Sequence, residues 1–150
     1  MSDGYSDFKA SEPKPMIRHY YGDYIRFCFL AAAVVSFIAL PLWGYLLPLG
    51  LVAQIAGGLI LVLLAGLTNP HGKLIMVLNA VASGVGALLI EITAINYRTI
   101  DSLQLLIVRE VEVVLLVLAF YFAVKTARSM FLHKVGEVER PWEFDTKPTE

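Results

Sequence analysis

Four ionisable residues lie inside strongly apolar segments, and their side chains are the ones that could do chemistry. Glu91 falls in the apolar segment 74–95, and Arg109, Glu110 and Glu112 fall in the apolar segment 103–124. Ionisable groups within a bilayer are usually paired, turned toward other helices or functional, because placing Asp, Lys or Arg at a helix centre costs about 2.5 to 3.5 kcal/mol. We interpret these residues as one intramembrane polar cluster of three carboxylates and one guanidinium.

The spacing of the cluster predicts how its members meet. On a helix, Arg109 and Glu112 are three residues apart and share a face, whereas Glu110 points about 100° away from Arg109, toward a different helix or a second subunit. Glu91 and Arg109 each lie roughly 6 to 9 Å from the loop between their helices, at 1.5 Å per residue. We therefore expect Glu91 and Arg109 to pair across an antiparallel hairpin and to link these two helices.

Other kinds of site are not indicated by the sequence. There is no HExxH, GxGxxG or P-loop pattern, and the serines lack a neighbouring base that would mark a nucleophile. His19, Asp23, His71 and His133 show no paired ligand spacing, so we predict no metal site, no cofactor and no enzyme. The basic residues flank apolar segments, which favours an orientation signal or anionic lipid over nucleic acid.

The composition requires a lipid environment. The chain of 150 residues is 57% hydrophobic and 17% charged, with a mean hydropathy of +0.67, whereas soluble domains are nearer half apolar and a quarter charged. No charged residue or histidine occurs between Arg26 and His71. As one helix, the run 27–67 would extend about 60 Å, twice the roughly 30 Å hydrocarbon core. It must fold back, and the prolines and glycines between Pro41 and Gly50 mark the break.

We therefore predict an all-α polytopic membrane protein with four transmembrane helices in an antiparallel bundle. The expected helices span about 25–44, 49–67, 74–95 and 103–124, the last continuing into a cytoplasmic extension, within a transmembrane domain of 16–134. Residues 1–15 are expected to form a flexible polar tail and residues 135–150 an acidic tail.

Two further groups of residues are expected to position this bundle. Small residues recur at spacings of three or four on the third helix, which predicts a helix-packing face that also includes Glu91. Aromatic residues at the ends of the first two helices are expected to anchor them at the membrane surface. The helix-packing face comprises Ala80, Ser83, Gly84 and Ala87, and the interface anchors are Tyr20, Tyr21, Tyr24, Trp43 and Tyr45.

The distribution of Lys and Arg predicts the orientation. With four spans, ten basic residues near the termini and the 68–73 turn share one side of the membrane, and only Arg98 lies in the loop on the other side. The positive-inside rule then places both termini in the cytoplasm. The pattern fits a plasma membrane, with a bacterial inner membrane as the expected location.

Two functions remain open at this point. In the first, the charged cluster is structural, and the protein is an accessory or partner-binding membrane component, in a homo-oligomer or with a larger membrane protein. In the second, Glu91, Glu110 and Glu112 exchange protons, cations or a small solute under the influence of Arg109. A flux assay in proteoliposomes separates the two, because a structural role would alter assembly rather than flux.

Overall fold

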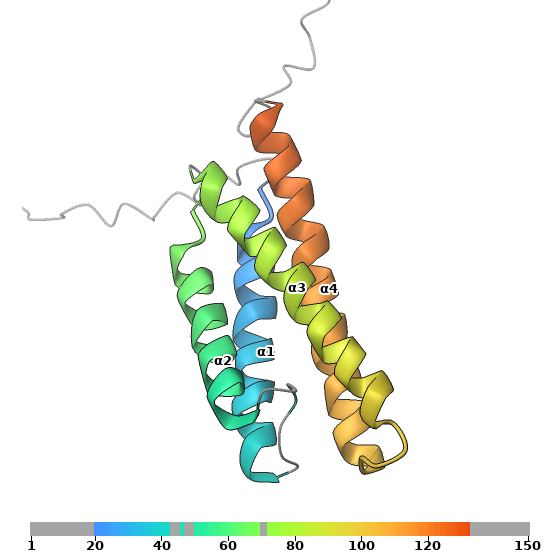
Figure 1. Cartoon of the computed structure of the whole chain (residues 1–150). Helices are drawn as coiled ribbons and strands as arrows, with labels where there is room; N and C mark the ends of the chain where they lie inside the picture. The colour runs from blue at the N-terminus through green and yellow to red at the C-terminus, as the bar shows by residue number, and fades with distance from the viewer. Residues whose placement is uncertain (1–19, 43–45, 47–49, 70–71, 133–150) are drawn as a thin grey trace, which may run out of the picture.

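The computed structural model describes residues 20–42, 46, 50–69 and 72–132, and within them the only regular secondary structure is α-helix. Four helices follow one another along the chain (Figure 1): α1 (Gly22–Leu42), α2 (Gly50–Leu67), α3 (Lys73–Tyr97) and α4 (Leu103–Phe131). The all-helical prediction is confirmed. The predicted tails and the anchors Trp43 and Tyr45 lie outside the described residues.

The helix ends follow local chain chemistry. α1 begins at Gly22 rather than at residue 25, and its last described residue is Leu42, directly after Pro41. α2 begins at Gly50, whose φ of +76° favours glycine. The hydroxyl of Ser102 accepts a 3.3 Å hydrogen bond from the backbone N–H of Leu105 and so caps α4. At its far end α4 continues beyond the predicted apolar stretch to Phe131.

Three of the helices are long and apolar enough to cross a membrane, namely α1, α2 and α3. α4 is not among them, although four membrane spans were predicted. Its first half carries Arg109, Glu110 and Glu112, and its last turns carry Lys125 and Arg128. These charges lower the apolar character of the longest helix.

The helices form two hairpins that are joined along one side. α3 packs most extensively on α4, and α1 packs on both α2 and α4, whereas α2 and α3 touch at few points. Figure 1 shows α2 and α3 diverging toward the end of the molecule where α3 turns into α4. We call this end the loop end, and we call the opposite end, where α3 begins and α4 finishes, the basic end.

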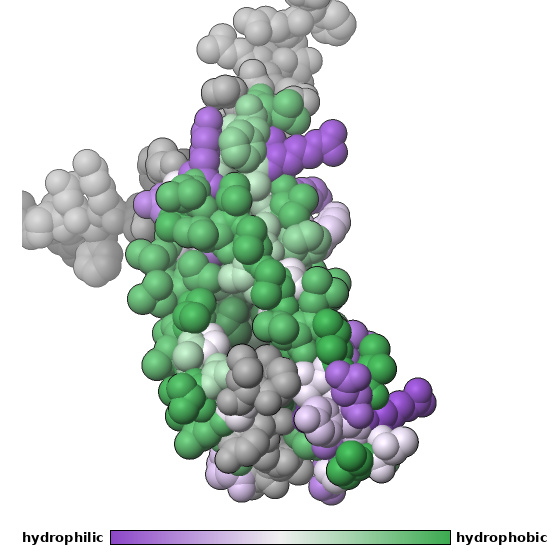
Figure 2. Space-filling model, viewed as in Figure 1, coloured by the Kyte–Doolittle hydropathy of each residue, from purple (hydrophilic) through white to green (hydrophobic). Residues whose placement is uncertain are grey.

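The surface of the described helices is largely apolar. Figure 2 shows hydrophobic side chains over most of the visible face and hydrophilic ones gathered near the two ends. Large side chains such as Leu59, Leu88 and Val114 are more than half exposed along the middle of the helices. This distribution is the one expected of a bundle whose outer surface contacts lipid.

Candidate functional site

A buried carboxylate lies at the centre of the bundle. α4 turns one regular stripe of side chains inward, and Arg109 and Glu112 belong to it while Glu110 is exposed. Glu112 is only 2% exposed, and its Oε1 accepts a 2.5 Å hydrogen bond from the hydroxyl of Ser36 on α1. Its other oxygen, Oε2, is buried without a hydrogen-bond partner among the described residues. This carboxylate therefore joins α1 to α4 and keeps one acceptor unused.

Gln54 extends this polar contact to α2. Its side-chain Nε2 donates a 2.7 Å hydrogen bond to the carbonyl oxygen of Ser36, and its Oε1 accepts a 2.7 Å bond from the backbone N–H of Leu46. Both functions of the buried amide are thus satisfied, as low-dielectric surroundings require. We call Ser36, Gln54 and Glu112 the central polar site.

A cavity of about 330 Å³ adjoins the central polar site. It lies between α2 and α3, where these helices make few contacts, and all three residues of the central polar site line it. The remaining lining side chains are apolar or glycine, and they include Val81, Val85 and Leu89, which are also part of the outer surface. The cavity is therefore an apolar pocket, accessible from the side of the bundle, with one carboxylate in its wall.

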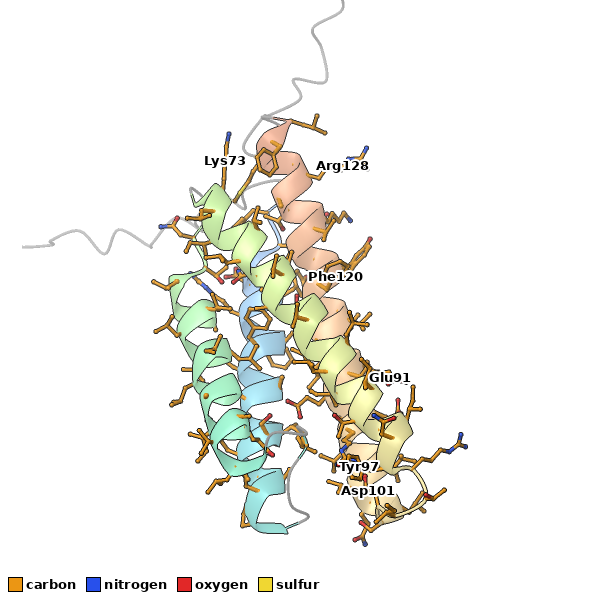
Figure 3. All side chains as sticks on the ribbon, viewed as in Figure 1. Lys73, Glu91, Tyr97, Asp101, Phe120 and Arg128 are labelled. Atoms are coloured by element: carbon orange, nitrogen blue, oxygen red, sulfur yellow. The ribbon has the colours of Figure 1, made fainter. Side chains whose placement is uncertain are left out.

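Arg109 is paired with a loop residue. Its Nη1 donates to the carboxylate of Asp101, in a contact that is both a hydrogen bond and an ion pair. The guanidinium carbon also lies 5.9 Å from the ring centroid of Tyr97, a cation–π arrangement that links it to the end of α3. Figure 3 shows Tyr97 and Asp101 close to one another at the loop end. Arg109, at 3% exposure, thus fastens α4 to the connection that precedes it.

The expected pair between Glu91 and Arg109 is replaced by this contact with Asp101. Among the described residues the ion pairs are Arg109 with Asp101 and Arg26 with Asp23, and Glu91 takes part in neither. The physical reason is that the Arg109 guanidinium can contact the Asp101 carboxylate directly. Asp101 lies in the loop immediately before α4, on the face of the helix to which Arg109 belongs. The contact of Arg109 with α3 is instead with the Tyr97 ring at the end of that helix.

Glu91 and Glu110 form a separate site on the outside of the α3–α4 hairpin. They share a surface hollow of about 280 Å³ with Arg98 and with the apolar residues Ala94, Ile95 and Leu106. Glu110 is exposed and Glu91 is half-buried. Figure 3 places Glu91 on this hairpin, between its middle and the loop end. The single predicted cluster is therefore divided into the central polar site, the Arg109 contact and this outer acidic hollow.

The small residues predicted on α3 are buried or half-buried, and Gly84 lies against α4. Ser83 and Ala87 are buried, and a Cβ at Gly84 would come within 3.2 Å of the Phe120 ring, while Ala80 is half-buried. Ser83 satisfies its hydroxyl by donating a 2.6 Å hydrogen bond to the carbonyl oxygen of Asn79. This face therefore contributes close approach of the two helices.

The basic end combines aromatic and charged side chains. The rings of Tyr21 and Tyr24 stack on Phe122 of α4, and the Lys125 ammonium lies 4.5 Å from the centroid of Tyr21. The interaction with the Tyr21 side chain raises the pKa of Lys125 above its ordinary value. Of the predicted anchors, Tyr24 is well exposed, whereas Tyr20 and Tyr21 are half-buried.

Sequence reasoning did not assign Ser36 and Asp101 their observed roles. Ser102 caps α4, and Asp101 pairs with Arg109. The sequence did contain a signal for this pair. Asp101, Leu105 and Arg109 are spaced by four residues, and helical side chains tilt toward the N-terminus of the helix, so Arg109 faces back toward Asp101. No comparable signal connects Ser36 to Glu112, since they come from helices at opposite ends of the chain.

Comparison of the chain with protein-family models, with curated proteins and with solved structures gives no match. The class that the fold itself defines is a small all-helical protein with three helices able to cross a membrane. Its distinguishing features are the central polar site and the outer acidic hollow.

Proposed function

We propose that this chain is a partner-binding component of the plasma membrane, with four membrane spans and both termini in the cytoplasm. In this topology α4 is the fourth span, and its buried charges are accommodated by Ser36 and Asp101. Lys73 and Arg128 lie together at the basic end, opposite Tyr97 and Asp101 (Figure 3). A cytoplasmic basic end follows from the positive-inside rule, and a bacterial inner membrane is the location that fits best.

The observation that carries this proposal is the outer acidic hollow. Glu110 lies seven residues after the start of α4 at Leu103, which is about 10 Å along the helix axis. Glu91 lies six residues before the end of α3 at Tyr97, at a similar depth. Two carboxylates on an outward-facing surface at this depth are costly in lipid. A second copy or a larger membrane protein that covers the hollow and supplies a polar partner removes that cost.

Cysteine cross-linking in intact membranes tests the proposal. In a Cys28→Ser background, Val111→Cys places a thiol on the exposed surface next to Glu110, and Val52→Cys places one on the exposed surface of α2. We expect cross-linked species of defined mass from Val111→Cys, and far less from Val52→Cys. Adding Glu91→Gln and Glu110→Gln should abolish the cross-link. Equal cross-linking at both positions, or no effect of the two glutamine variants, would refute the proposal.

A second function, transport of a cation or small solute, is favoured by the unpartnered Oε2 of Glu112 at a cavity. Flux through proteoliposomes distinguishes it. If the protein is a transporter, Glu112→Gln should remove flux that Glu110→Gln preserves. If its role is structural, the unaltered protein and both variants should all give the same flux as empty liposomes.

A further inference from the structure

The cavity between α2 and α3 has the features of a ligand site. Its volume of about 330 Å³ falls in the range of small-molecule pockets. Its walls are apolar, and within the described lining the only ionisable group is Glu112. This residue lines the cavity and is almost fully buried, and one oxygen of its carboxyl group has no described hydrogen-bond partner. Such an orphaned acceptor in a cavity wall points to a donor or a cation that is supplied from outside the chain.

The other polar groups of the cavity are already engaged. Ser36 uses its hydroxyl to donate to Oε1 of Glu112, and Gln54 uses both ends of its amide within the protein. Among the side chains that line the cavity, Glu112 is therefore the one with a polar atom that no described group uses, and its surroundings are otherwise apolar. The matching molecule has one polar, positively charged group and an apolar body.

Other ligand classes match less well. A bare metal ion requires several oxygen or nitrogen ligands, and no group of three or more His, Cys, Asp or Glu occurs among the described residues. An anion would be repelled by the carboxylate. An uncharged acyl chain would fill the apolar volume and leave Oε2 without a partner.

We propose that this cavity binds a monovalent cationic amphiphile from the membrane, with Glu112 as its counter-ion. The cationic group lies beside the Glu112 carboxylate, where low-dielectric surroundings strengthen the ionic interaction. The apolar body lies between α2 and α3 along Val81, Val85 and Leu89. This site is distinct from the outer acidic hollow, because neither Glu91 nor Glu110 lines the cavity.

Direct binding to the full chain in phosphatidylcholine nanodiscs tests the proposal. The probe is tritiated dodecylamine, and the competitors are decylamine, which like the probe is cationic at neutral pH, and decanol, which has the chain length of decylamine without its charge. We expect saturable binding of the probe that decylamine displaces at a concentration at least about tenfold lower than decanol. Equal displacement by both competitors would overturn the proposal, because the cavity would then recognise only an apolar chain.

Three variants identify the site. Glu112→Gln keeps an acceptor for Ser36 and should weaken probe binding by at least about tenfold. Asp23→Asn, which removes an exposed carboxylate outside both the cavity and the outer acidic hollow, should leave binding unchanged. Val85→Trp adds bulk from a half-exposed position of the cavity wall and should reduce binding without changing the charge. Unchanged binding to Glu112→Gln or to Val85→Trp, in samples whose helical circular dichroism matches the unaltered protein, would refute the assignment.

Discussion

Ser36 on α1 and Glu112 on α4 are separated by 76 residues in the chain, and a 2.5 Å hydrogen bond joins their side chains inside the bundle. The bond connects the two hairpins along the side where they are in contact. Because Glu112 is buried with one oxygen already unpartnered, loss of the Ser36 hydroxyl would leave both carboxyl oxygens without a described donor. The central polar site is therefore a point at which a small change has a large effect on stability.

Ser36→Ala tests this relationship. We expect it to lower the free energy of unfolding by about 1–3 kcal/mol, the cost of leaving a buried polar group unsatisfied. Ser129→Ala is the control, because the Ser129 hydroxyl donates only to the exposed Lys125 carbonyl within the same helix. Reversible unfolding in mixed micelles, followed by helical circular dichroism, measures both. Equal effects of the two substitutions would contradict the structural role of the Ser36 hydroxyl.

Asp101→Asn should destabilise the α3–α4 hairpin. The substitution removes the carboxylate charge that faces the buried Arg109 guanidinium, and breaking a buried pair in this way costs about 3 kcal/mol. Asp23→Asn removes the partner of Arg26 in an exposed pair at 3.4 Å, where the expected loss is below about 1 kcal/mol. The same unfolding assay compares them. A smaller loss for Asp101→Asn than for Asp23→Asn would show that Asp101 does not stabilise Arg109.

Thr68→Val should loosen the turn between α2 and α3. The Thr68 hydroxyl accepts a 2.9 Å hydrogen bond from Nδ2 of Asn79 and donates a 2.7 Å bond to the Leu64 carbonyl oxygen. Valine keeps the shape and removes both bonds, so we expect a loss of about 1–2 kcal/mol. Thr68→Ser retains the hydroxyl and should recover most of the lost stability. Failure of serine to do so would assign the effect to packing of the methyl group.

Gly58→Val should separate α2 from α1. Even a Cβ at Gly58 would come within 2.7 Å of the Phe37 ring, so a branched side chain requires that ring to move, at a cost of about 1–3 kcal/mol. Gly66→Val is the matched control on the same helix, since nothing lies within 4 Å of a Cβ at Gly66. Unfolding free energies of the two variants should differ by more than about 1 kcal/mol. Similar unfolding free energies for the two variants would show that the close approach of Gly58 to Phe37 does not hold α2 against α1.

Helix positions were predictable from sequence because they depend on local properties. The break between α1 and α2 follows from Pro41 and Gly50, and the start of α4 follows from Ser102. The division of α4 into an inward stripe with Arg109 and Glu112 and an outward Glu110 follows from helical periodicity alone. These features need no knowledge of which helices touch.

Contacts between helices were less predictable. Equal depth suggested that Glu91 would meet Arg109, but depth fixes only one coordinate, and the rotation of each helix about its axis decides which side chains face one another. In the structure that rotation turns Glu91 to the outer surface and Arg109 toward Asp101. The cavity beside Glu112 depends on the few contacts between α2 and α3, which no local pattern encodes.

The sideways opening between α2 and α3 determines how a solute would arrive. A molecule that enters there comes from the acyl-chain layer, after it has already left the aqueous phase. Its occupancy of the cavity then scales with its membrane partition coefficient multiplied by its aqueous concentration. Among cations of equal affinity for Glu112, the more lipophilic ones would saturate the protein at the lowest total dose.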